Sequence, residues 1–357
     1  MNGTENKDRI SKYLSPRIQN MMFAELSPDY LSRTGASEIL SGIPVPVGIE
    51  GSDAKGAIDL KSIVLNMARV MGGDPLFLYA DKYSDFIKHA LGENAVAMLV
   101  SEGAHSADEG DFEDACMLLR AALRIDPRSR EALYLYARAC KEAYETEAAM
   151  AEDGMGDEER VGMFKAESSE TFELLTMIHP DFAMGYYFLG YAYLNMGLYL
   201  KARLTWQDFL KLSAGSETEI HEMDDQLLAS LREEISGRVE ELEEPVEIET
   251  GCNRIMGGDF AGGRDTLMKF TEGRYSQWWP LWYYLGIAEA ALGNKDEAIA
   301  DLRKVLTLSP SNTEAMEELA AIYEATGDAV NASKYRKKIE IVNKNLEEER
   351  AENPSTN

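Results

Sequence analysis

Two stretches of this sequence align with each other without a gap: YYLGIAEAALGNKDEAIADLRKVLTLSP at residues 283–310 and YFLGYAYLNMGLYLKARLTWQDFLKLS at residues 187–213. Each contains a small residue, a glycine seven positions later and an alanine five positions after that; in the first stretch these are Gly286, Gly293 and Ala298. The same spacing of small residues recurs from Gly103, Gly251 and Ala320, always with glycine in the middle. With only 28 glycines in 357 residues, chance does not explain this pattern, which indicates a repeat.

The spacing predicts pairs of antiparallel helices. Apolar residues before and after the middle glycine recur with a helical period, which predicts two helices of about fourteen residues in each repeat. The glycine is expected to end the first helix in a left-handed conformation, and the Asp or Asn that commonly follows it is expected to start the second. The small residues on either side are expected where the two helices cross. Where no insertion intervenes, successive repeats are spaced by 34 or 35 residues, as from Gly286 to Ala320 and from Gly251 to Gly286.

A helix-turn-helix repeat of this length and pattern resembles the tetratricopeptide repeat (TPR). The aromatic-x-x-Leu-Gly start of that family appears at Trp282-x-x-Leu285-Gly286 and at Tyr186-x-x-Leu189-Gly190. The similarity covers roughly residues 94–345. It implies an all-α fold, a right-handed α-solenoid of antiparallel helix pairs. It also implies that the first helix of each pair lines a concave groove that binds peptides or protein segments.

Departures from the repeat spacing divide the chain. The sequence predicts an N-terminal helical region at 1–92, repeats one to three at 93–214, an additional amphipathic helix at 215–243, repeats four to six at 244–345 and a disordered tail at 346–357. The additional helix is either a spacer packed on its neighbours or a dedicated partner helix. The N-terminal region holds either no repeat or one degenerate repeat, and no strand is expected in the chain.

An acidic insertion near 145–163 interrupts the repeat that begins near Arg130. The second helix of this repeat is delayed, so that Ser168 takes the second crossing position opposite Ala137. We expect the insertion to extend one helix and add a loop. It lacks the alternating ligand spacing of a calcium-binding loop, so no metal site is expected there.

The charge and cysteine content limit the classes of partner. The chain has 63 acidic and 36 basic residues, a net charge of −27, which argues against nucleic acid or an anionic membrane as partner. Its three cysteines are too few and too scattered for a disulfide framework. There is no apolar signal segment at the start and no apolar stretch long enough to span a membrane, so a cytoplasmic location is expected.

No catalytic or metal-binding pattern is evident. The four histidines fall in different segments without metal-ligand spacing. We find no nucleophile motif and no glycine-rich phosphate-binding loop. The chain is therefore expected to have no enzymatic activity, no metal and no cofactor.

The groove implied by the resemblance should be lined by fixed positions on the first helix of each repeat. The candidate peptide-binding residues are Tyr134, Arg138, Lys141, Tyr187, Tyr191, Asn195, Tyr283 and Ile287. One end of the groove is expected to be partly basic, its middle aromatic and apolar, and its far end acidic. The alternative is that the tyrosines cover neighbouring helices. The Lys, Asn and Arg clamp with which some TPR proteins hold an acidic C-terminal tail is absent, which disfavours a strongly acidic ligand.

The aromatic stretch QWWPLWYYLG at 277–286 divides by its register in the repeat. Trp282 and Leu285 occupy core positions and Gly286 the crossing position, while the preceding proline suits the first turn of a helix. Trp278 is placed to pack against Tyr283 or to cover the preceding helix. The ligand contacts that remain are Tyr283 and, as an addition, the neighbouring Trp279.

These observations favour a non-enzymatic protein–protein interaction scaffold. Its groove would take an apolar or aromatic segment of a partner, with basic flanks as an additional feature. The alternative is a self-contained regulatory or structural protein whose own IPVPV segment, residues 43–47 of the extended stretch 41–51, occupies the groove. An enzyme or metal protein is the least favoured class.

Overall fold

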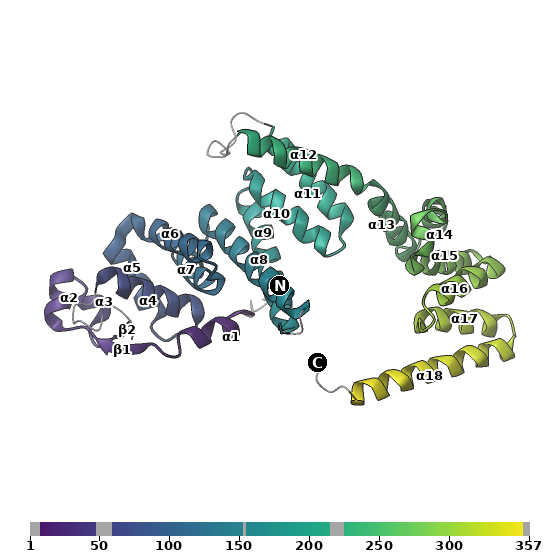
Figure 1. Ribbon diagram of the computed structural model, residues 1–357, viewed down its shortest axis with the longest axis horizontal. Coiled ribbons are helices and arrows are strands. Elements are labelled where there is room, and N and C mark those ends of the chain that lie inside the picture. The colour runs from purple at the N-terminus through teal and green to yellow at the C-terminus, as the bar shows by residue number, and fades with distance from the viewer. Residues whose placement is uncertain (1–7, 48–58, 153–154, 215–224, 353–357) are drawn as a thin grey trace. The chain divides into compact units, whose positions relative to one another are not determined.

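The structure, a computed structural model, describes residues 8–47, 59–152, 155–214 and 225–352 (Figure 1). Within these residues the fold is an all-α solenoid of helix pairs, as expected, with one small pair of strands near the N-terminus. The chain forms two compact units, which are described separately. Unit 1 is Met1–Asn195 with Thr205–Ala229, and unit 2 is Met196–Leu204 with Ser230–Asn357.

The helix pairs follow the predicted repeats. In the first half of the chain they are α6 (Ala95–Asp108) with α7 (Phe112–Ile125), α8 (Arg130–Glu152) with α9 (Glu158–Ile178), and α10 (Ala183–Asn195) with α11 (Tyr199–Leu212). Unit 2 contains α13 (Glu243–Met256) with α14 (Phe260–Leu267), α15 (Trp279–Leu292) with α16 (Lys295–Leu308), and α17 (Thr313–Ala325) with α18 (Ala329–Glu352). Figure 1 shows α17 and α18 of the last pair running back along each other.

The repeated glycines have the two roles that their spacing predicts. All five middle glycines adopt a positive φ, for example 86° at Gly293, where the chain leaves α15 in the left-handed region. The crossing glycines let the paired helices approach closely. A Cβ atom on Gly286 would lie 2.7 Å from Leu302 Cγ, and one on Gly190 would lie 2.1 Å from Trp206 Nε1. The local pattern thus sets both the turn and the crossing of each pair.

The acidic insertion lengthens both helices of its pair, which corrects the expectation that it extends one helix and adds a loop. Helix α8 continues to Glu152 and α9 begins at Glu158, so the connection between them is short. Asp157 caps α9 by accepting a hydrogen bond from the Arg160 backbone N–H. The predicted crossing is present: Ser168 Oγ donates a hydrogen bond of 2.8 Å to the Ala137 carbonyl oxygen.

The additional helix and the C-terminal helix differ in extent from the sequence expectation. Helix α12 spans Asp225–Glu241, and its predicted apolar stripe includes the fully buried Ile235; the start of the predicted helix lies outside the described residues. Helix α18 continues to Glu352, well into the stretch expected to be a disordered tail, because its end is rich in the strong helix formers Glu, Ala and Arg. Residues 353–357 lie outside the described residues.

A pair of strands near the N-terminus corrects the expectation that the chain has none. Strand β1 (Met22–Glu25) pairs antiparallel with β2 (Pro44–Val47). Around the strands lie α1 (Ser11–Leu14), α2 (Pro28–Thr34), α3 (Ser37–Leu40), α4 (Leu60–Gly73) and α5 (Ala80–Leu91). Both prolines of β2 lack an N–H, which is tolerated because a two-stranded sheet has only edge strands.

The IPVPV segment belongs to this N-terminal core. Val45 is fully buried in a cluster with residues of α4 and α5, and Tyr83 Oη of α5 donates a hydrogen bond of 2.6 Å to the Pro44 carbonyl oxygen. The segment therefore does not lie on the predicted groove residues, which corrects the alternative in which it occupies the groove. The last part of the extended stretch, from residue 48, lies outside the described residues.

Candidate functional site

A cavity of about 750 Å³ lies in unit 2. Its walls come from α13, α15 and α17, the first helices of three successive pairs, together with the start of α11. The aromatic residues that line it are Tyr199, Tyr275, Trp278, Trp279, Tyr283 and Tyr284. The cavity thus lies on the helices that the resemblance assigns to the groove, and six of its fifteen lining residues are aromatic.

The aromatic wall is held by the repeat itself. Trp278 caps the N-terminus of α15 and Pro280 occupies the first turn, where a missing N–H leaves no bond unmade. Trp282 Nε1 donates a hydrogen bond of 2.9 Å to the Ser276 carbonyl oxygen, and Leu285 is fully buried. The predicted core positions of Trp282 and Leu285 in QWWPLWYYLG are confirmed. Their neighbours Tyr283 and Tyr284 line the cavity.

Two tryptophans of this wall remain open to solvent, since Trp278 is 41% and Trp279 37% exposed. The Trp279 ring packs edge-on against Tyr283, with centroids 6.3 Å apart, and Tyr283 packs in the same manner against Tyr284 at 5.8 Å. The ring beside Tyr283 is thus that of Trp279, four residues earlier on the same helix face. The sequence had offered Trp278 either for this contact or as a cover of the preceding helix. Such fixed aromatic surfaces offer a large contact area to an apolar group.

The charged groups at this cavity are acidic. Its lining contains Glu249 and Glu314 and no lysine, arginine or histidine. Glu249 Oε2 accepts a hydrogen bond of 2.8 Å from the Leu200 backbone N–H at the start of α11. Partial burial raises the pKa of Tyr283, and the carboxylates of Glu318 and Glu314 on α17 raise it further. The site therefore combines aromatic surface with negative charge.

The predicted groove tyrosines of α8 and α10 pack against aromatic neighbours within unit 1. Tyr134 contacts Phe182 edge-on at 5.2 Å. Tyr187 packs against Phe209 at 5.5 Å, and Tyr191 against the buried Trp206 at 4.9 Å. These rings cover neighbouring helices, and each is also partly exposed to solvent.

The polar residues predicted beside them are also engaged. Lys141 forms ion pairs with Glu145 at 2.5 Å and with Glu142 at 3.6 Å, so the basic end expected of the groove is neutralised at this position. The Arg138 guanidinium lies over the rings of Tyr134 and Phe188. The Asn195 carbonyl oxygen accepts a hydrogen bond from Lys165 Nζ at 3.3 Å. In unit 2, Ile287 packs into the core one turn beyond Tyr283 and does not line the cavity.

Sequence analysis missed several lining residues. Tyr284 and Tyr275 flank the recognised core positions, and Tyr284 Oη lies 3.8 Å from Met256 Sδ of α13. Tyr199 begins a second helix, a place from which the repeat pattern predicts no groove contact. The density of aromatic residues in 275–284 was the available sign of a binding site in the sequence. The repeat register, however, predicted ligand contacts only for the residues on one face of the helix.

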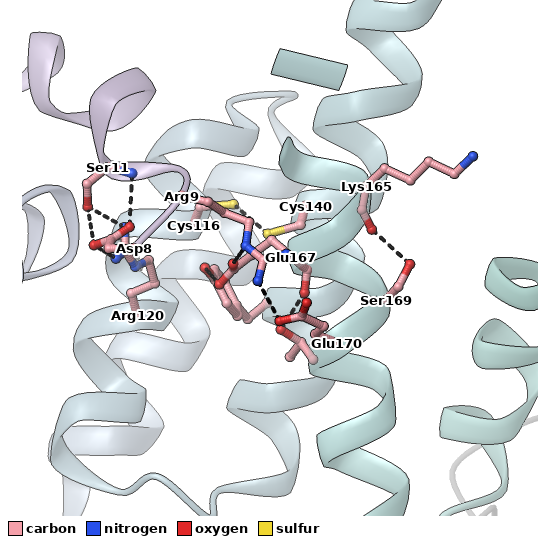
Figure 2. A network of polar contacts seen from close by, with 12 residues as sticks. Asp8, Arg9, Ser11, Cys116, Arg120, Cys140, Lys165, Glu167, Ser169 and Glu170 are labelled. Atoms are coloured by element: carbon pink, nitrogen blue, oxygen red, sulfur yellow. Dashed lines mark hydrogen bonds and ion pairs between the residues drawn. The ribbon is translucent and has the colours of Figure 1, made fainter. Parts of the chain in front are cut away.

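A second polar cluster lies where the N-terminal segment meets α7, α8 and α9 in unit 1 (Figure 2). Figure 2 shows Asp8 and Ser11 facing Arg120 of α7, while Arg9 forms ion pairs with Glu170 at 2.7 Å and with Glu167 at 3.5 Å. These contacts neutralise the carboxylates and hold the segment in place. The cluster is therefore assigned a structural role.

Two thiols lie buried beneath this cluster. Cys116 Sγ and Cys140 Sγ lie 3.6 Å apart in the interior, and neither side chain is exposed. Burial raises the pKa of Cys140 well above its usual value, which keeps the thiol protonated and a poor nucleophile. Across the described residues, histidines, cysteines, aspartates and glutamates form no group of three or more that could hold a metal ion. Likewise, no helix described here is both long and apolar enough to cross a membrane.

Comparisons with known proteins agree with this architecture. The family model of the tetratricopeptide repeat matches residues 279–312, which hold α15, α16 and the turn after them. FK506-binding protein-like proteins of Homo sapiens and Rattus norvegicus are each 52% identical to the chain over 40 residues, which are 11% of this chain and 12% of those proteins. The match thus spans about an eighth of these relatives and characterises a single repeat-sized segment.

Solved structures that match the chain share little sequence with it. MamA from Desulfovibrio magneticus is 13% identical, with 72% of this chain and 98% of that chain covered and a TM-score of 0.26. A tetratricopeptide repeat protein from Parabacteroides merdae is 15% identical over 78% of this chain and 91% of that chain, with a TM-score of 0.29. The APC/C hetero-tetramer Cut9-Hcn1 is 14% identical, with 79% of this chain and 60% of that chain covered and a TM-score of 0.31. At such values no partner or activity is transferred from these structures.

Proposed function

We propose that this chain, whose residues 279–312 match the tetratricopeptide repeat, is a non-enzymatic interaction scaffold that holds an apolar or aromatic segment of a partner protein in the unit 2 cavity. The observation that carries this proposal is the cavity itself, whose walls come from the first helices of three successive pairs and whose aromatic lining comes mainly from α15 and the residues just before it. Protein and peptide binding is the use for which stacked helical repeats present such surfaces.

The chemistry of the cavity supports a peptide ligand. Aromatic residues that are rigid and partly exposed are the anchors on which most binding energy concentrates in protein interfaces. The exposed faces of Trp278 and Trp279 supply such anchors at the N-cap and first position of α15, and the Trp279 ring packs against Tyr283. A nucleic acid or an anionic membrane is not proposed as partner, since the net charge of −27 repels both. A cytoplasmic location is part of the proposal, because the three cysteines are free and buried.

The test is selection of binding peptides from a random display library on the full chain, followed by affinity measurement through the fluorescence of the unit 2 tryptophans. We expect selected peptides to carry an apolar or aromatic residue, and Trp279→Ala and Tyr283→Ala to weaken them about 10-fold or more, as for loss of an aromatic anchor. Leu292→Ala is the matched control, because Leu292 is an exposed residue of the same helix that does not line the cavity. Peptides that bind all three variants as they bind the parent chain would show that the cavity is not the binding site.

A further inference from the structure

We infer that the occupant of the unit 2 cavity presents a lysine or arginine side chain, next to an apolar residue, to the tryptophan and tyrosine rings of α15 and the carboxylates of α17. This inference rests on the proposed function and specifies the chemistry of its partner. It follows from the combination of aromatic faces, negative charge and absence of a basic residue in the cavity lining. Aromatic faces attract cations through their negative π-systems, most strongly where the cation is partly removed from water.

The carboxylates on this side of the cavity lack cations of their own. Glu314, Glu317 and Glu318 share one face of α17, since residues three and four apart on a helix are neighbours. Among the described residues, no lysine, arginine or histidine makes an ion pair with any of the three. Burial and the nearby Glu317 raise the pKa of Glu318, as expected of a carboxylate with an acidic neighbour and no cation beside it. A cation from outside the chain would complete this arrangement, whereas an acidic ligand would be repelled.

The rim of the same cavity shows that this combination accepts a guanidinium. Arg274 lies over the ring of Tyr275, 4.8 Å from its centroid, and pairs with Glu244 at 2.6 Å. One aromatic ring of the lining is thus already used by a cation of the chain, held between a ring and a carboxylate. The ring of Tyr283, against which Trp279 packs, has acidic neighbours of the same kind, without a lysine or arginine in the lining.

Unit 1 shows what kind of segment binds an acidic surface of this chain. The N-terminal segment buries Ile10 and Leu14 completely, and its basic residues pair with the surrounding carboxylates. Lys12 contacts Glu159 at 2.7 Å, and Arg17 contacts Asp111 at 2.6 Å. The chain thus holds its own apolar and basic segment through the chemistry that we infer for the partner in unit 2.

The inference is tested with three degenerate heptapeptide libraries that differ only in the central residue, which is arginine, its neutral isostere citrulline, or glutamate. Each library, labelled with a fluorophore, is titrated onto the full chain at low salt and followed by fluorescence polarisation. We expect the arginine library to bind about 5- to 10-fold more tightly than the citrulline library, and the glutamate library to bind least. The preference should shrink as salt screens the carboxylates.

Variants connect the preference to the cavity. Glu314→Gln and Glu318→Gln should each reduce the ratio of arginine to citrulline binding at least twofold, and Glu340→Gln on the exposed face of α18 should leave it unchanged although it removes the same charge. If the arginine and citrulline libraries bind the parent chain equally and neither binds Trp279→Ala, this inference is overturned and the proposed function stands. Failure of every library to bind would overturn both, and tightest binding of the glutamate library would contradict the inferred charge.

Discussion

Single atoms decide how closely the paired helices approach. At Gly190 the space for a Cβ is taken by the indole of Trp206, which is fully buried and donates a hydrogen bond of 3.1 Å to the Tyr187 carbonyl oxygen. At Gly162, in α9, a Cβ would meet no atom within 4 Å. The same residue type is therefore required at one position by packing and is merely tolerated at the other.

Exchange of these two glycines for alanine should have opposite effects on the free energy of unfolding. Gly190→Ala forces the indole aside and is expected to destabilise the protein by about 1–3 kcal/mol, as for other overpacked sites. Gly162→Ala relieves the entropic cost of glycine within a helix and should stabilise by about 0.5–1 kcal/mol. Chemical denaturation of the two variants checks this, with Trp206 fluorescence as a local probe; a neutral Gly190→Ala would mean that α10 and α11 do not cross here.

At the scale of elements, polar contacts join helices that are distant in sequence. Asp114 in the first turn of α7 accepts hydrogen bonds from Arg69 of α4, at 2.6 and 2.9 Å, and from Ser106 of α6, at 2.9 Å. Burial raises the pKa of Asp114, but the hydrogen bonds and charge of Arg69 and the hydrogen bond of Ser106 outweigh it, so the pKa lies below its usual value. One carboxylate thereby ties the N-terminal helices to the first repeat.

This contact predicts a loss of stability in acid. A carboxyl group with a lowered pKa in the folded state contributes stability that is complete above its unfolded pKa, about 4, and is lost as the pH falls through the folded pKa. At pH 7 the free energy of unfolding of Asp114→Asn should be about 1–3 kcal/mol lower than that of the parent chain, because Arg69 loses its charge partner. Between about pH 5 and pH 3 the variant should lose less stability than the parent chain, because it lacks the carboxyl group that is protonated there.

Urea denaturation at several pH values measures both effects. Asp81→Asn is the control, because Asp81 pairs with Arg124 while 91% exposed and should change the pH dependence little. Parallel pH profiles for the parent chain and Asp114→Asn would remove Asp114 as a source of acid sensitivity.

At the scale of the whole molecule, charge is strongly unbalanced, with 63 acidic residues against 36 basic ones. Part of this imbalance is relieved within unit 1, where the basic N-terminal segment pairs with acidic side chains of α7 and α9. In unit 2 the carboxylates of α17 at the cavity have no such partner among the described residues. Excess negative charge disfavours the compact state through repulsion.

Salt should therefore stabilise the protein. Raising sodium chloride from about 20 mM to about 500 mM shortens the Debye length several-fold and is expected to raise the midpoint of thermal unfolding by a few degrees. The gain from screened repulsion should exceed the loss from weakened surface ion pairs, which contribute little each. Differential scanning calorimetry at constant pH measures the shift, and a lower midpoint in high salt would show that attractive pairs dominate.

The site could be predicted from the sequence only in part. Tyr283 was found because its place is set by its distance from Gly286, a relation that holds within one helix. Trp278 and Tyr284 lie on the same stretch, but whether they face a core or a cavity depends on α13 and α17, which the register of α15 does not specify. Lys141 was expected to give one end of the groove a positive charge, but its ion pairs with Glu142 and Glu145 neutralise that charge.

The sequence by itself determined the helix pairs, their turns and their crossings, because these depend on residues within a single repeat and on the geometry of the α-helix. The tertiary structure alone decided that Pro44–Val47 pairs with Met22–Glu25, that Ile10 and Leu14 anchor the N-terminal segment, and that three first helices enclose an aromatic and acidic cavity. Each of these brings together residues far apart in the chain. Their contacts arise from the packing of whole elements, which no local spacing encodes.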